Sequence, residues 1–253
     1  MPLQPSLGRL AYFVDRKHRR RIIKFAEGAP TEGHFLPVRN ADNPRVVAIG
    51  ASAGGLEAFR RLIENLPVDT GMAFVLLTHI LRGSSSLLPE ILARSTKMPV
   101  IQVTDEMRLL ANHIYVIPPD KLMEISEGSL HLVPRPLKGA NNAIDHFLFS
   151  LAEDRVFGSI GIILSGEGSD GAEGIKILKE ESGGVTMAQE PASAASKSMP
   201  INAIQIDHVD HVLSPEDIAH KLASMSWRDS NIRKTPLKVL WMRKPIPIQG
   251  RAV

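Results

Sequence analysis

The amino-acid sequence predicts an α/β fold: a doubly wound, mostly parallel sheet with helices on both faces and a β-hairpin at an edge. Two observations lead to this fold class. Several short runs are apolar throughout, as in buried parallel strands, and segments with helical periodicity alternate with them along the chain. A third observation adds the hairpin, because two apolar runs flank a turn that contains Gly128. A chain of 253 residues is long enough to bury a large core.

The predicted elements follow one another in the order expected for such a sheet. The strands cover the apolar runs at 45–50, 72–79, 99–103, 113–117, 159–166, 183–188 and 210–213. The helices cover 54–66, 86–94, 143–154 and 171–181, and a last one begins after Ser214. In the first of these helices, one face carries Leu56, Phe59, Ile63 and Leu66. A short amphipathic helix is also expected within 7–25.

Charge divides the chain into three parts. The total of +3 splits into +4 over 1–44, +6 over 225–253 and −7 over 45–224. We therefore expect a basic N-terminal extension, a catalytic domain over 45–224 and a basic C-terminal tail. Solvated charge explains such ends, and contact with an acidic protein surface or a membrane is the alternative. Nucleic-acid binding is not indicated, because the ends lack interleaved aromatic residues and show no helix-turn-helix pattern.

Composition excludes several kinds of chemistry. The sequence has no cysteine, which rules out disulfides, thiolate nucleophiles and cysteine-based zinc sites. No apolar run approaches the roughly 18 residues that a transmembrane helix needs. The N-terminus lacks the order of charge and apolar residues found in signal peptides. We therefore expect a cytoplasmic protein without a transmembrane segment.

The loop after the first predicted strand carries a candidate nucleophile. Gly50-Ala51-Ser52-Ala53-Gly54 has the G-x-S-x-G spacing that places a serine on a sharp turn between strand and helix. Small neighbours leave the hydroxyl of Ser52 exposed, and the free N–H groups of the following helix favour a developing oxyanion. The alternatives are a phosphate-binding glycine loop and a small-residue turn with Ser52 as the helix N-cap.

Two further strand ends carry a candidate base and a candidate acid. His79 ends the run 72–79, and histidine is the residue type that most readily acts as a base near neutral pH. Asp170 lies in the glycine-rich loop 166–171, where an aspartate can orient a histidine. The alternatives are a structural histidine and a helix N-cap. Together the three residues form a Ser–His–Asp set at the carboxyl ends of parallel strands, where sites of doubly wound sheets form. Their chain order differs from that of standard α/β-hydrolases.

The sequence resembles the catalytic domain of the chemotaxis receptor methylesterase (CheB) family. The similarity covers about 45–224 and rests on AIGASAGGLEAFRRLIENLP, FVLLTHI, HIYVIPPDK, AIDHFLFSLAED, IILSGEGSDGAEGI and MP-x-NAI. In detail it is most similar to the methylesterase domains fused to receptor methyltransferases. The order of GASAGG, a strand-end TH and GEGSDG is highly specific to this family.

This resemblance implies both an activity and a site. It implies that Ser52 is the nucleophile, His79 its base and Asp170 the residue that orients His79. The site loops around the oxyanion then contain Ala53, Glu167 and Gly168. Family members demethylate glutamate methyl esters on the cytoplasmic helices of chemoreceptors, and many deamidate glutamines there. No metal and no organic cofactor is implied.

Two departures from the family pattern keep alternatives open. Family enzymes usually carry a receiver domain of about 120 residues before the catalytic domain, whereas 44 residues precede it here, so we expect that regulation to be absent from this chain. Glu167 stands where the family usually has Met or Thr, and its carboxylate opposes a developing oxyanion unless it points to solvent or pairs with a cation. The alternatives are an inactive receptor-binding module of the same fold and a hydrolase of small esters.

Overall fold

The structure is a computed structural model of the whole chain. It describes residues 44–80, 83, 86–136, 142–154 and 158–225, and the backbone of 10–14 and 20–24. Contacts divide the chain into two units, Met1–Val38 and Arg39–Val253. The expected C-terminal tail at 225–253 lies outside the described residues apart from Met225.

The described part of the first unit consists of two strands. β1 (Leu10–Val14) and β2 (Arg20–Lys24) pair antiparallel, with Leu10 opposite Lys24. The helix expected within 7–25 is therefore wrong. The segments LAYFV and RRIIK are rich in aromatic and β-branched residues, which favour strands, and pairing satisfies the backbone groups that each strand turns towards the other. The spacing of apolar residues did not distinguish strands from a helix here, because short apolar runs fit both the helical period of about 3.6 residues and the strand period of about 2.

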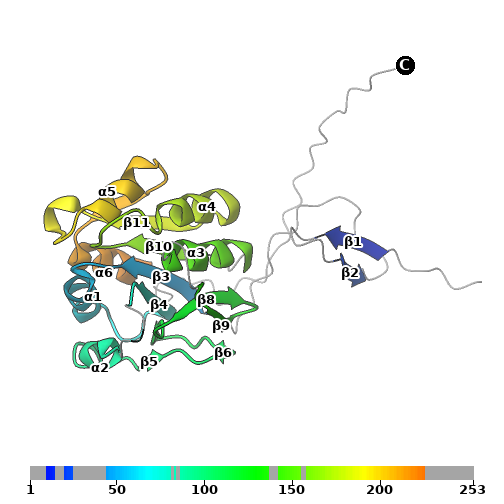
Figure 1. The fold of residues 1–253 in the computed structure, drawn as a ribbon, viewed down its shortest axis with the longest axis horizontal. Helices are drawn as coiled ribbons and strands as arrows, with labels where there is room; N and C mark the ends of the chain where they lie inside the picture. The colour runs from blue at the N-terminus through cyan, green and yellow to red at the C-terminus, as the bar shows by residue number, and fades with distance from the viewer. Residues whose placement is uncertain are drawn as a thin grey trace, which may run out of the picture. The chain divides into compact units, whose positions relative to one another are not determined.

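The second unit is built on a seven-stranded sheet in the order β12-β11-β10-β3-β4-β7-β5 (Figure 1). Every neighbouring pair in this sheet is parallel. The strands are β3 (Arg45–Ala51), β4 (Met72–Thr78), β5 (Val100–Gln102), β7 (His113–Val116), β10 (Ile160–Ile163), β11 (Val185–Gln189) and β12 (His211–Leu213). The predicted fold class is confirmed.

Helices cover both faces of this sheet (Figure 1). The helices are α1 (Gly55–Glu64), α2 (Leu88–Leu92), α3 (Ala143–Asp154), α4 (Ala172–Ser182), α5 (Ser198–Gln205) and α6 (Pro215–Ser224). Strand side chains alternate between faces, so Val46 and Ala48 join one buried cluster, and Val47 and Ile49 join the other. Residues of α3, α4 and α5 complete the first cluster, and residues of α1, α2 and α6 complete the second.

The predicted hairpin is present in a small sheet of its own. β8 (Lys121–Ser126) and β9 (Ser129–Pro134) pair antiparallel, and β6 (Met107–Arg108) adds to β9. The turn residues Glu127 and Gly128 have φ of 53° and 77°. Positive φ at both central positions is the type I′ pattern, which matches the twist of the flanking strands.

Two local features differ from the sequence-based expectation. Leu56 is 44% exposed, although it shares a helical face with the buried Phe59, Ile63 and Leu66. It lies in the first turn of α1, and Leu62 contributes to the core instead. The second difference is α5, which was not expected as a helix. No helix within the described ranges has the length and apolar character needed to cross a membrane.

Candidate active site

The candidate site lies where the sheet reverses its direction of growth. β3 has β4 on one side and β10 on the other, so the chain leaves β3 to build one half of the sheet and returns beside it to build the other. Loops diverge at such a switch point and leave a crevice beyond the carboxyl ends of the strands. Ser52 follows β3, His79 follows β4 and Asp170 follows β10.

The turn that carries Ser52 depends on glycine and on a buried serine. The N–H of Ser52 donates to the carbonyl oxygen of Ser165 at 2.9 Å, and the N–H of Gly55 donates to that of Ser52 at 2.8 Å. Gly54 has φ of 73°, and a Cβ there would lie 2.7 Å from the Cβ of Ala195 and 2.8 Å from the Oγ of Ser165. A side chain at position 54 is therefore excluded by both conformation and space.

His79 bridges the other two residues of the set. Its Nε2 lies 2.7 Å from Oδ2 of Asp170, and its Nδ1 lies 3.2 Å from Oγ of Ser52. A carboxylate only accepts hydrogen bonds, so Nε2 carries the ring proton and donates to Asp170. In the neutral ring Nδ1 is then an acceptor, and the hydroxyl of Ser52 donates to it. In the well-known Ser–His–Asp triad of serine proteases, Nε2 faces the serine and Nδ1 faces the aspartate. In this protein the two nitrogens exchange these partners.

Asp170 is a buried residue, 8% exposed, whose carboxylate lies against the N-terminus of α3. Its Oδ2 accepts from the N–H of Ile144 at 3.0 Å, and its Oδ1 accepts from the N–H of Asp145 at 2.9 Å. Free N–H groups and the dipole at a helix N-terminus favour a negative charge. Asp170 caps a helix as well as contacting His79, but the helix is α3 and not the one that follows it.

Three backbone N–H groups are candidate donors to an oxyanion: that of Ala53, which follows Ser52, and those of Glu167 and Gly168 in the loop after β10. In the part of the chain that the structure describes, no acceptor is bonded to any of the three. The loop after β10 approaches Ser52 closely, because a Cβ at Gly166 would lie 3.1 Å from the Cβ of Ser52. The side chain of Glu167 is exposed and accepts a hydrogen bond from Oγ of Ser198 at 3.4 Å.

Asp145 was not among the candidate site residues, because the sequence indicated only that it lies in a helix. In the structure it contacts the loop that carries Asp170. Its Oδ1 accepts from the N–H groups of Gly171 at 2.9 Å and Gly174 at 2.7 Å. Burial, followed by the charge of Asp170, raises the pKa of Asp145 to about 6. An acidic residue in the first turn of a helix is a common helix signal, so nothing local distinguished it.

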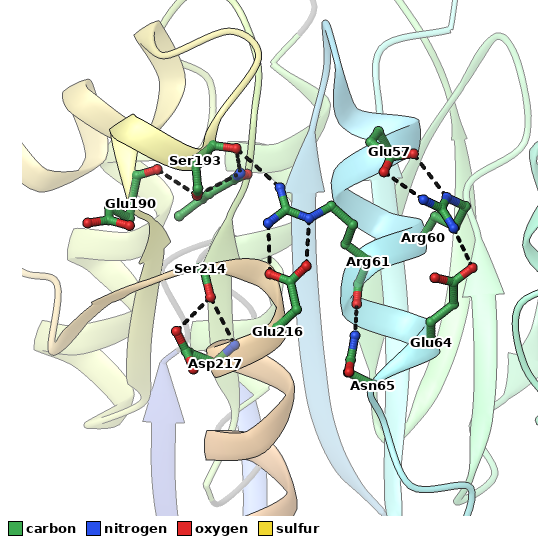
Figure 2. A network of polar contacts seen from close by, with 11 residues as sticks. Glu57, Arg60, Arg61, Glu64, Asn65, Glu190, Ser193, Ser214, Glu216 and Asp217 are labelled. Carbon is green, nitrogen blue, oxygen red and sulfur yellow. Dashed lines mark hydrogen bonds and ion pairs between the residues drawn. The ribbon is translucent and has the colours of Figure 1, made fainter.

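A polar network joins α1 to α6 and to the segment that follows β11 (Figure 2). Arg61 of α1 forms a bidentate ion pair with Glu216 of α6, at 2.6 and 2.8 Å, and donates to the carbonyl oxygen of Ser193 at 3.3 Å. The same oxygen accepts from Nε2 of Gln189, whose Oε1 accepts from the N–H of Ser165. Ser165 in turn binds the N–H of Ser52.

The side chain of Ser165 also bonds to Ala53, the residue after Ser52, and to Ser196. Its buried hydroxyl donates to the carbonyl oxygen of Ala53 at 2.8 Å and accepts from the N–H of Ser196 at 2.9 Å. The turn that carries Ser52 is thus held by hydrogen bonds to both the backbone and the side chain of Ser165. Among the described residues, no group of three His, Asp or Glu side chains is arranged to hold a metal ion.

Fold and site together define the class of protein. It is a doubly wound α/β protein whose switch point holds a hydrogen-bonded Ser–His–Asp set, the residue types of a serine hydrolase. The sequence profile of the CheB methylesterase family matches residues 47–222, and the chain belongs to this family.

Relatives and one solved structure agree with this assignment. The chain is 34% identical over 221 residues to a protein-glutamate methylesterase/protein-glutamine glutaminase 1 of Carboxydothermus hydrogenoformans, covering 82% of this chain and 65% of that protein. It is 34% identical over 189 residues to a Leptospira interrogans protein named "putative protein-glutamate methylesterase/protein-glutamine glutaminase", covering 70% of this chain and 92% of the relative. The crystal structure of the Thermotoga maritima CheB methylesterase catalytic domain superposes with a TM-score of 0.65 at 25% identity, covering 72% of this chain and 99% of that domain.

Proposed function

We propose that this protein hydrolyses glutamate methyl esters on the cytoplasmic helices of methylated chemoreceptors, and that it deamidates glutamines in such segments. The observation that carries the proposal is His79 hydrogen-bonded to Ser52 on one side and to Asp170 on the other. Family membership and the names of the relatives, which combine methylesterase with glutaminase, support the substrate class. The cytoplasm is the compartment in which such helices are accessible.

The first half of the reaction forms an acyl-enzyme. Nδ1 of His79 takes the proton of the Ser52 hydroxyl as Oγ attacks the side-chain carbonyl carbon of the methylated glutamate. Asp170, bound to Nε2, stabilises the imidazolium that forms. The proton then passes from Nδ1 to the leaving oxygen, methanol departs, and the glutamyl group stays on Oγ of Ser52. With a glutamine substrate, ammonia leaves instead.

The second half releases glutamate. Water attacks the acyl carbon while Nδ1 of His79 takes its proton, and the same proton returns to Oγ of Ser52 as the ester bond breaks. In both halves the carbonyl oxygen becomes negatively charged. The N–H groups of Ala53, Glu167 and Gly168 stabilise that charge in our proposal, since they have no other acceptor within the described residues.

The catalytic unit is assigned to residues 45–224. Its first strand begins at Arg45 and its last helix ends at Ser224, so every element of the seven-stranded sheet lies inside these limits. The basic segments 1–44 and 225–253 act in encounter with an acidic partner surface and leave the chemistry to the central part.

Release of methanol from a methylated receptor tests the proposal. The cytoplasmic fragment of a receptor, carrying isotopically labelled methyl esters, is incubated with the protein, and methanol is measured. Mass spectrometry of the same fragment reports deamidation. Ser52→Ala should lower kcat on the order of a millionfold, as expected for a triad nucleophile, and His79→Ala should be similarly severe.

Ser169→Ala is the matched control. Ser169 is exposed, lies next to Asp170 in the same loop, and its side chain forms no hydrogen bond within the described ranges. It should retain wild-type activity. A Ser52→Ala protein with more than about a tenth of the wild-type rate would contradict the triad. Turnover of a nitrophenyl ester without methanol release would instead favour a hydrolase of small esters, and inactivity on both would favour a binding module.

A further inference from the structure

The helix that follows Asp170 cannot cap itself. The N-cap position of α4 is Gly171, which has φ of 94° and no side chain to accept a hydrogen bond. A Cβ there would clash with Cδ1 of Ile163 and lie 2.7 Å from Cγ2 of Ile144. Both conformation and packing exclude any other residue. The N–H of Ala172 donates to the nearby carbonyl oxygen of Ser169 at 3.1 Å, whereas the N–H groups of Gly171 and Gly174 need an acceptor from elsewhere in the fold.

Asp145 supplies that acceptor from the first turn of α3. One oxygen, Oδ1, accepts from both Gly171 and Gly174. Gly174 leaves the space that this contact needs, because a Cβ there would lie 3.0 Å from the same oxygen and 2.7 Å from the Cβ of Leu148. Gly171 at the N-cap and Gly174 in the first turn of α4 therefore allow the carboxylate of Asp145 to reach the helix end.

The two aspartates cap each other's helices. Asp170 precedes α4 and accepts from the N-terminus of α3, while Asp145 lies in α3 and accepts from the N-terminus of α4. Asp170 adjoins Gly171, so the bond from Gly171 to Asp145 fixes the backbone at the residue next to Asp170. The direction in which the carboxylate of Asp170 faces His79 follows from that backbone.

We propose that Asp145 is a positioning residue that fixes Asp170, and through it the ring of His79, by holding the N-terminus of α4. The inference rests on the proposed function, because it concerns the triad that performs that reaction. No hydrogen bond within the described residues joins Asp145 to Ser52 or His79, so its effect passes through Asp170, by the contact between the two residues and by the loop at 170–171. Its role is geometric: the acceptor oxygen matters and the negative charge does not.

Three substitutions separate geometry from charge. Asp145→Asn keeps an oxygen where Oδ1 lies, and kcat should stay within about threefold of wild type. Asp145→Ala removes the acceptor, and kcat should fall about tenfold to a hundredfold with KM unchanged, as for a displacement of catalytic groups by about 1 Å. Asp145→Glu keeps charge and acceptor but adds one methylene, so kcat should also fall, by about tenfold.

Ser214→Ala provides a control for the loss of a helix cap. Ser214 caps α6, with its Oγ accepting from the N–H of Asp217 at 3.2 Å, and it takes no part in the triad. Asp145→Ala and Ser214→Ala should both lower the melting temperature, but Ser214→Ala should leave kcat unchanged. The rate at which a fluorophosphonate labels Ser52 gives a second readout of the triad that needs no receptor.

The outcomes distinguish this proposal from the proposed function. Normal kcat and labelling rates in folded Asp145→Ala or Asp145→Glu would overturn the positioning role, and so would an Asp145→Asn protein as slow as Asp145→Ala. If the wild type is labelled but releases no methanol, the receptor substrate is wrong, and the labelling rates alone then decide the role of Asp145. A wild type that shows neither reaction overturns both proposals.

Discussion

Replacing Asp170 by asparagine tests the electrostatics of the site most directly. Asp170 accepts three hydrogen bonds, two at Oδ2 and one at Oδ1. Asparagine offers one acceptor oxygen and one NH2 group. The orientation with fewer conflicts places its oxygen towards His79 and Ile144 and its NH2 group against the N–H of Asp145. The ring of His79 then keeps its tautomer, and the main change is the loss of the negative charge.

The magnitude follows from the short contact between acid and base. A separation of 2.7 Å between Nε2 of His79 and Oδ2 of Asp170 places the two charge centres about 4 Å apart once the imidazolium forms. At an effective dielectric constant of about 20 the lost attraction is about 4 kcal/mol. Transition-state arithmetic converts this into a decrease in kcat of about a thousandfold. The unpaired N–H of Asp145 should also destabilise the fold by about 1–3 kcal/mol.

Steady-state methanol release and thermal unfolding measure these two effects separately. Asp105→Asn is the matched control, because Oδ1 of Asp105 also accepts two backbone N–H groups, from Glu106 and Leu132, but outside the triad. It should leave kcat unchanged. A folded Asp170→Asn protein with less than about a tenfold decrease in kcat would refute the electrostatic reasoning.

Three further predictions concern stability, the site rim and the domain limits. Burial raises the pKa of Asp145 to about 6 from 3.8, so the folded protein binds a proton before the unfolded chain does as the pH falls. As the pH falls from 7.5 to 4, the free energy of unfolding of the wild type should therefore rise relative to that of Asp145→Asn, by about 1 kcal/mol after allowance for solvent screening. Thermal unfolding of both proteins across this range measures the difference, and an equal pH dependence would contradict the prediction. Glu167→Thr should change kcat/KM less than about threefold at physiological salt, because the carboxylate of Glu167 is exposed and bonded to Ser198. A gain above about tenfold would show that this carboxylate faces the oxyanion. A truncated protein spanning 45–224 should fold and retain esterase activity, and circular dichroism showing loss of tertiary structure would contradict the domain limits.

The proximity of Ser52, His79 and Asp170 was predictable from sequence because each residue follows a strong local pattern, an apolar strand. Ser52, His79 and Asp170 come after apolar strands, and parallel strands bring their carboxyl ends to one edge of a sheet. The glycines around Ser52 indicated a turn too tight for side chains, and the space around Gly54 agrees. Amphipathic helices and the Glu127–Gly128 turn were likewise visible in short stretches of sequence.

The tertiary structure decided what depends on distant neighbours. The sequence alone gave no means of telling that β1 and β2 pair with each other in place of a helix, or that Leu56 lies exposed. It also left open that Nδ1 of His79 faces the serine, since the ring orientation is set by Asp170, 91 residues further along the chain. Asp145 and Gly171 are 26 positions apart, and their hydrogen bond exists because two glycines let α3 and α4 approach. Periodicity records which face of a segment is buried, whereas a hydrogen bond between helix ends depends on how whole elements pack, and no local pattern encodes that packing.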